Sequence, residues 1–122
     1  MKRILTITAI SGMTAVMLGA FGTHSLKKII SPEMLEVYKT GVQYQFYHTF
    51  ALLMVGVLMQ FKSSKSLNWS AYLFIAGIVL FSGSLYALAI SDIKILGAIT
   101  PVGGVAFIAG WVLLAIHVSK KE

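Results

Sequence analysis

Residues 66–91 are SLNWSAYLFIAGIVLFSGSLYALAIS, a stretch that contains no charged side chain. An α-helix rises about 1.5 Å per residue, so about 20 apolar residues cross the hydrocarbon core of a bilayer once. This stretch is long enough to cross once and too short to cross twice. We therefore expect it to form one transmembrane helix.

Three further uncharged stretches repeat the pattern, at residues 4–26, 40–61 and 95–119. Charged residues make up 11% of the chain, against about a quarter in soluble domains, and hydrophobic residues make up 57%. The sequence predicts a single all-α membrane domain over residues 1–122, an integral membrane four-helix bundle. We expect its spans at about residues 4–22, 40–61, 67–90 and 98–118.

The basic residues flank these stretches. Ten Lys and Arg outnumber four Asp and Glu, but their positions indicate anchors at the lipid headgroups and no nucleic-acid partner. With four spans, both termini lie on one face, and that face has the larger share of basic residues: Lys2, Arg3, Lys62, Lys65, Lys120 and Lys121. Because cytoplasmic segments are enriched in Lys and Arg, we expect both termini in the cytoplasm.

Two short motifs predict where helices begin. Ser31-Pro32-Glu33 combines an N-cap residue, a proline for the first turn and an acidic group for the positive end of the helix dipole. The turns after Pro32 are too polar for hydrocarbon, so we expect an interfacial helical entry to the second span. Thr100-Pro101 has the same cap-and-proline pattern and favours a late start of the fourth helix.

Residues for reaction chemistry are scarce. The chain has no cysteine, and its serines have a histidine as a base but no acidic residue within a span to orient it. His24 and His48 alone fall short of a usual metal ligand set. The sequence therefore predicts no catalytic residue, no metal site and no cofactor, and it favours a non-enzymatic role.

Polar side chains gather in the half of the membrane away from the termini. Tyr44 and His48 lie four residues apart and so share one helix face. Two compatible interpretations stay open: hydrogen bonds between helices, or a pocket for a neutral or amphiphilic ligand such as a lipid, a quinone or a small solute. The candidate ligand-binding residues are His24, Gln43, Tyr44, Gln45, His48, Ser84, Tyr86 and Thr100.

Small residues recur at helical spacing. Gly12 and Gly19 in the first span, and Gly103 and Gly110 in the fourth, are seven residues apart. Such faces allow another helix to approach closely, including a helix from a second copy of the chain in a homo-oligomer. Our first hypothesis is therefore a structural or partner-binding membrane protein. The alternative is a ligand-binding protein, able to hold a lipid, or a transport component centred on His48.

Four segments carry the unusual polar and small residues: 18-LGAFGTHSL-26, 40-TGVQYQFYH-48, 80-LFSGSLY-86 and 96-LGAITPVGG-104. In their order and spacing the chain resembles the domain-of-unknown-function 423 family, also called uncharacterised protein family 0382 and related to transmembrane protein 256. The resemblance implies a bacterial cytoplasmic-membrane protein of about four helices. It implies no established reaction, substrate, cofactor or catalytic residue.

Overall fold

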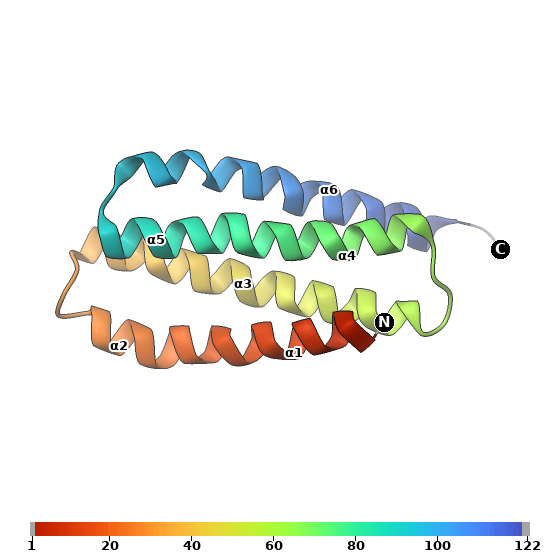
Figure 1. Ribbon diagram of the computed structural model, residues 1–122, viewed down its shortest axis with the longest axis horizontal. Helices are drawn as coiled ribbons and strands as arrows, with labels where there is room; N and C mark the ends of the chain where they lie inside the picture. The colour runs from red at the N-terminus through yellow and green to blue at the C-terminus, as the bar shows by residue number, and fades with distance from the viewer. Residues whose placement is uncertain (1, 121–122) are drawn as a thin grey trace.

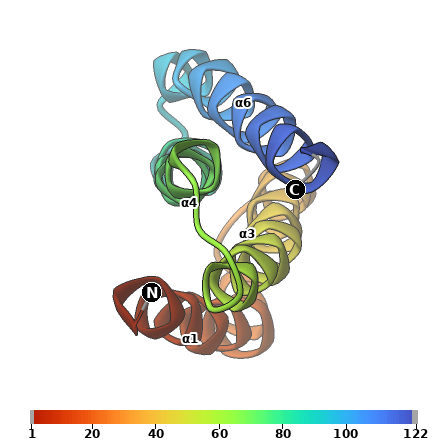
Figure 2. The same cartoon turned by 90° about the vertical axis from the view of Figure 1, so that its right-hand side faces the viewer.

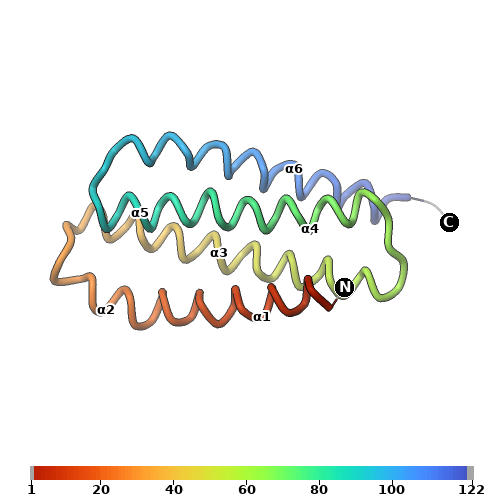
Figure 3. Tube along the Cα trace, viewed as in Figure 1, coloured from red at the N-terminus to blue at the C-terminus, as the bar shows by residue number. Residues whose placement is uncertain are grey.

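The computed structural model describes residues 2–120, which form four long helical segments joined by short links. Successive segments run in opposite directions, so the N-terminus and the C-terminus lie at the same end (Figure 1, Figure 3). In chain order the elements are α1 (Lys2–Val16), η1 (Met17–Gly22), α2 (Thr23–Leu26), α3 (Pro32–Met59), α4 (Lys65–Gly77), η2 (Ile78–Ser82), α5 (Gly83–Ser91), η3 (Lys94–Ala98) and α6 (Thr100–Ser119).

Figure 2 shows the segments nearly end-on as an open zigzag, with α1 at one edge and α6 at the other. The packing follows this order, with α1 against α3, α3 against α4 and α5, and α4 against α6. The all-helical prediction is confirmed, and the four-helix bundle stays a prediction. In the zigzag, α3 and α4 have neighbours on two sides, whereas the two outer helices have long open faces.

Three of the long segments in residues 2–120 are apolar and long enough to cross a membrane: Lys2–Leu26, Lys65–Ser91 and Lys94–Ser119. Large apolar side chains such as Phe21, Val105 and Ile108 are well exposed on their outer surfaces. Such exposure is costly in water and is expected in lipid. The segment of α3 is absent from this set because two glutamines and a histidine interrupt its middle.

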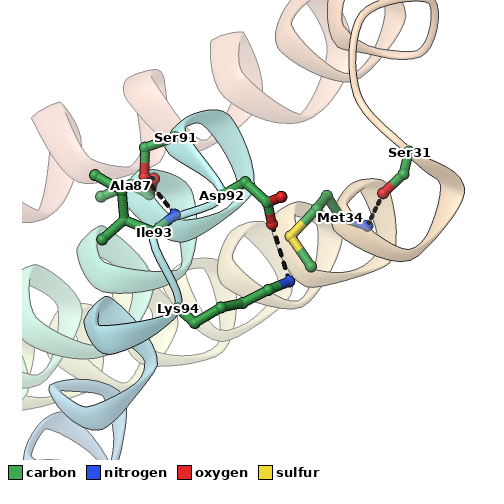
Figure 4. A network of polar contacts seen from close by, with 7 residues as sticks. All are labelled: Ser31, Met34, Ala87, Ser91, Asp92, Ile93 and Lys94. Atoms are coloured by element: carbon green, nitrogen blue, oxygen red, sulfur yellow. Dashed lines mark hydrogen bonds and ion pairs between the residues drawn. The ribbon is translucent and has the colours of Figure 1, made fainter.

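The start of α3 confirms its prediction. Ser31 has an extended backbone, and its hydroxyl oxygen accepts the backbone N–H of Met34 over 3.1 Å, with Pro32 in the first turn (Figure 4). At the same end, α5 stops where Asp92 adopts a left-handed conformation with φ of 58°. Lys94 pairs with the Asp92 carboxylate over 2.9 Å in the short link that follows (Figure 4).

The start of α6 confirms the late start of the fourth helix but not the predicted cap. The helix begins at Thr100 with Pro101 in its first turn, and the N-cap residue is Ile99, which makes no side-chain bond. The Thr100 hydroxyl lies 2.6 Å from the Ser84 hydroxyl instead of capping its own helix. Residues 94–98 form a turn of 3₁₀-helix that leads into α6. A tertiary hydrogen bond has therefore replaced the local one.

Two π-helical turns, η1 and η2, were not predicted from the sequence. Each turn lies beside the same part of α3 and hydrogen-bonds to it: the Tyr38 hydroxyl donates to the Leu18 carbonyl oxygen of η1 over 2.6 Å, and the Ser82 hydroxyl of η2 donates to the Gly41 carbonyl oxygen over 2.7 Å. Single π turns inside helices often occur at functional sites. These two turns fix α3 between its neighbours.

Candidate ligand-binding groove

His48 lies in the middle of α3 and is 5% exposed. Its Nδ1 atom is 2.8 Å from the Tyr44 carbonyl oxygen, and because a carbonyl can only accept, Nδ1 carries the proton and donates. The Nε2 atom is then an acceptor, and the indole N–H of Trp111 in α6 donates to it over 3.1 Å. Both ring nitrogens are therefore used inside the chain, and His48 links α3 to α6.

Aromatic rings surround His48 on the side of α3 that faces α6. The imidazole lies flat against Phe107, with ring centroids 3.5 Å apart and planes 8° apart. Tyr44 packs on Phe81 of η2 at a centroid distance of 4.6 Å, and Phe81 packs on Phe107 at 5.4 Å. Because α3, η2 and α6 each contribute a ring, the rings form one continuous apolar wall.

A groove of about 360 Å³ lies along this wall, between α3 and α6. Ile108 is 65% exposed and Trp111 is 46% exposed, so the groove opens on the outer surface of the protein. Its volume is within the range of about 300–1,000 Å³ that is usual for small-ligand sites. The lining residues are Tyr44, His48, Phe81, Gly104, Phe107, Ile108 and Trp111.

Gly104 differs from the other glycines of α6 because its own chain does not require it. A Cβ atom at Gly103 or Gly110 would collide with η2 or with Phe74, respectively. A Cβ atom at Gly104 would have no neighbour closer than the Phe81 ring, at 3.9 Å, which is an ordinary contact. The missing side chain at Gly104 therefore leaves space in the groove and is not needed for the contact between α6 and η2.

Gln45 forms a second polar centre, on the side of α3 that faces α1 and α5. Its Nε2 atom donates to the Ser11 carbonyl oxygen over 2.9 Å and to the Thr14 hydroxyl over 3.0 Å, both in α1. Its Oε1 atom accepts the hydroxyl of Tyr86 in α5 over 2.6 Å. One amide, only 4% exposed, therefore joins three helical segments.

The eight candidate residues do not form one cluster. Gln43 is exposed and donates to the Tyr47 hydroxyl on the outer surface, and His24 is exposed in α2, apart from the others. The remaining six lie in three hydrogen-bonded pairs: Tyr44 with His48, Gln45 with Tyr86, and Ser84 with Thr100. Of the eight, the groove contains Tyr44 and His48.

All buried polar side-chain atoms in residues 2–120 have a hydrogen-bond partner. Hydrogen bonds between helices therefore account for Nε2 of His48 and for the side-chain amide of Gln45, whereas the Thr8 hydroxyl bonds within its own helix. Within the same residues, no group of three His, Cys, Asp or Glu side chains could hold a metal ion. Any ligand of the groove must be recognised mainly by its shape and its apolar surface.

Sequence reasoning missed the partners of both polar centres. Trp111 and Phe107 lie four residues apart on α6, a spacing that places both rings on one face, toward His48. Ser11 and Thr14 interrupt an apolar helix three residues apart, and their polarity was the available signal for a partner on α3. Pairing them with Gln45 required knowing which helices are neighbours.

Comparison with known proteins adds the family. The family model described as protein of unknown function (DUF423) matches residues 18–104, which include Gln45, His48 and four of the seven residues that line the groove. The chain belongs to this family. The resemblance carried by the four quoted segments is thereby confirmed.

Relatives extend over nearly the whole chain. A UPF0382 membrane protein of Staphylococcus aureus is 47% identical over 120 residues, which cover 98% of each chain. YwdK of Bacillus subtilis, also named a UPF0382 membrane protein, is 47% identical over 98% of each chain. The UPF0382 inner membrane protein YgdD of Escherichia coli is 45% identical over 97% of this chain and 92% of its own. No solved structure is significantly similar to the chain.

These relatives and the helical segments identify a multi-pass membrane protein of bacterial type. The names of the relatives give a location, and in Escherichia coli that location is the inner membrane. They give no reaction and no ligand. The geometry of the groove is therefore the basis for a functional proposal.

Proposed function

We propose that this member of the DUF423 family crosses the bacterial cytoplasmic membrane four times and binds an amphiphilic ligand in the groove beside His48, without catalysing a reaction. The groove and the open space at Gly104 are the observations that support ligand binding. An apolar chain or ring that enters from the bilayer would cover the exposed parts of Ile108 and Trp111. A lipid or a quinone has such a chain or ring.

The second of the four spans would be α3. A polar helix can lie in hydrocarbon when its polar groups are bonded within the protein, because the bilayer core has no water to satisfy them. Gln45, His48 and Thr49 are each at most 5% exposed, and each is bonded to a neighbouring residue or helix. The basic residues at the end that contains the termini support placing both termini in the cytoplasm.

A structural or partner-binding role has less support than the sequence alone gave it. That hypothesis rested on faces of small residues, and the structure uses most of these faces inside the chain. A Cβ atom at Gly19, Gly41, Gly56 or Gly110 would lie 3.1 Å or less from the chain's own side chains. These glycines already serve helix packing within one chain, and a homo-oligomer is not needed to explain them.

Two glycine variants test the proposed ligand. Gly104→Leu places a side chain in the groove, whereas Gly83→Leu adds the same atoms at a position where a Cβ has no neighbour within 4 Å and which does not line the groove. Both variants remove a helix glycine, so both gain similar helix propensity. We expect wild type and Gly83→Leu to retain a co-purified amphiphile in native mass spectrometry, and Gly104→Leu to lose it.

The same experiment can refute the proposal. If wild-type protein, extracted from its membrane in a mild detergent, carries no specific lipid or quinone, the groove is a packing defect and not a site. Equal retention by Gly104→Leu and Gly83→Leu would also contradict the proposal. Thermal unfolding of each variant checks that a loss of ligand does not come from a loss of fold.

A further inference from the structure

A second pocket lies at the end of the molecule that contains the termini, where α3 and α6 both finish. Its volume is about 390 Å³. Unlike the groove beside His48, it contains basic and hydroxyl side chains together with two aliphatic ones. The lining residues are Leu58, Lys62, Ser63, Ser64, His117, Val118 and Lys120.

The polar groups of this pocket are suited to an anion. The Ser64 hydroxyl lies 2.6 Å from Nδ1 of His117, which positions the imidazole at the pocket wall. When that hydroxyl donates to Nδ1, the other ring nitrogen carries a proton and can donate to a ligand. The ammonium group of Lys120 at the end of α6, which is exposed, adds a positive charge at the same pocket.

The charge distribution favours the same ligand class. The acidic residues of the described chain, Glu33, Glu36 and Asp92, all lie at the opposite end, where α3 begins and α5 stops. The end with the pocket contains Lys62, Lys120 and further basic residues near the N-terminus and at the start of α4. Clustered Lys and Arg at the cytoplasmic surface attract anionic lipid headgroups, and basic pockets between transmembrane helices bind them.

The pocket and the groove lie between the same two helices. On α3 the pocket begins at Leu58 and the groove ends at His48, and ten residues of helix span about 15 Å. This distance equals about half of the 30 Å hydrocarbon thickness, which is the depth that one acyl chain of one leaflet occupies. A ligand with an anionic group at one end and an apolar chain of leaflet depth therefore matches both sites together.

We infer that the chain binds an anionic phospholipid, with its phosphate in the pocket at Lys120 and His117 and an acyl chain along α3 and α6 into the groove beside His48. This inference rests on the proposed ligand-binding function and names the ligand class. A quinone has no phosphate for the pocket, and free phosphate has no chain for the groove. Only an anionic lipid can fill both sites at once, and it would belong to the leaflet on the same side of the membrane as the termini.

The experiment compares phosphatidylglycerol with phosphatidylcholine of the same acyl chains. Delipidated full-length protein is titrated with each lipid and examined by native mass spectrometry. Two lysines near an anionic headgroup predict a preference for phosphatidylglycerol of about 10- to 30-fold. The double variant Lys62→Gln/Lys120→Gln should lose most of that preference and still bind one lipid, whereas Lys94→Gln, at the opposite end, should keep it.

Separate outcomes identify which claim fails. Equal binding of the two lipids by wild type, or an unchanged preference in the double lysine variant, overturns the anionic headgroup site. If Gly104→Leu still abolishes lipid binding in that case, the groove function stands. If Gly104→Leu keeps the preference for phosphatidylglycerol, the claim that one lipid occupies both the pocket and the groove is overturned. If millimolar inorganic phosphate displaces the bound lipid as effectively as added phosphatidylglycerol does, the pocket is a site for free phosphate, and the claim of one lipid in both sites is also overturned.

Discussion

Two adjacent glycines of α6 should respond to alanine with opposite sign. At Gly103, a Cβ atom would lie 2.7 Å from the Cα of Phe81 and 2.8 Å from its Cβ, closer than real Cβ atoms approach. The obstruction is the main chain of η2, which cannot turn aside as a flexible side chain could. Gly103→Ala must therefore push α6 away from η2. At Gly104 the nearest atoms are 3.9 Å away, and alanine fits without movement.

The expected magnitudes follow from two opposing terms. Alanine in place of glycine stabilises a helix interior by about 1 kcal/mol, chiefly by restricting the unfolded chain. Overpacking a well-packed contact costs about 1–3 kcal/mol, and the upper part of that range suits a rigid obstruction. Gly104→Ala should therefore gain up to about 1 kcal/mol, and Gly103→Ala should lose about 1–2 kcal/mol. The difference between the two variants is about 2–3 kcal/mol.

Reversible unfolding provides the measurement. Each variant is titrated with sodium dodecyl sulfate in dodecyl maltoside micelles, and helicity is followed by circular dichroism. Gly83→Ala is the matched control, because a Cβ atom there has no neighbour within 4 Å, and it should behave like Gly104→Ala. If Gly103→Ala proves as stable as Gly104→Ala, then α6 and η2 do not approach as closely as described, and the wall of the groove is placed wrongly.

Two further predictions concern the polar centres. The first is a double-mutant cycle of Trp111→Phe and His48→Phe, measured by the same unfolding assay. We expect a coupling free energy of about 0.6–1.7 kcal/mol for the indole-to-imidazole hydrogen bond, and a value of zero would disprove that bond. In the second, Tyr86→Phe removes the hydroxyl that donates to Gln45 and should lower the free energy of unfolding by about 0.5–1.5 kcal/mol. The control Tyr72→Phe, at an exposed tyrosine, should leave the free energy of unfolding unchanged. Equal effects of the two variants would contradict the role of Gln45 in joining the helices.

The local chemistry of the chain was enough to predict the helices. The absence of charge over long stretches predicted the helical segments. Ser31 and Pro32 predicted the start of α3, because a cap depends only on residues within one turn. Thr100 presents the same local pattern and behaves differently, because the Ser84 hydroxyl of the preceding helix competes for it. A cap can be predicted only where no tertiary partner is nearby.

The candidate site depends on neighbours that sequence spacing does not give. Gln45 and His48 are three residues apart and so differ in direction by about 60° around α3. That angle places Gln45 against α1 and α5, and His48 against α6. The candidate residues were predicted as one cluster because they lie in the same half of the membrane. The zigzag arrangement of the helices separates them, and it was not predictable from one chain's periodicity.

The hydrogen bonds that the polar side chains already make within the chain limit what the groove can bind. The buried polar side-chain atoms in residues 2–120 are satisfied within the chain, so no buried side-chain group near His48 lacks a hydrogen-bond partner that a ligand could supply. A solute with many polar groups at that depth would lose its bonds to water and gain few in return, which costs several kcal/mol. The basic side chains lie instead in the pocket at the end of α6, about 15 Å along the helix from the depth of His48. A ligand that suits this chain therefore has its charge at one end and hydrocarbon at the other, which is the form of a lipid.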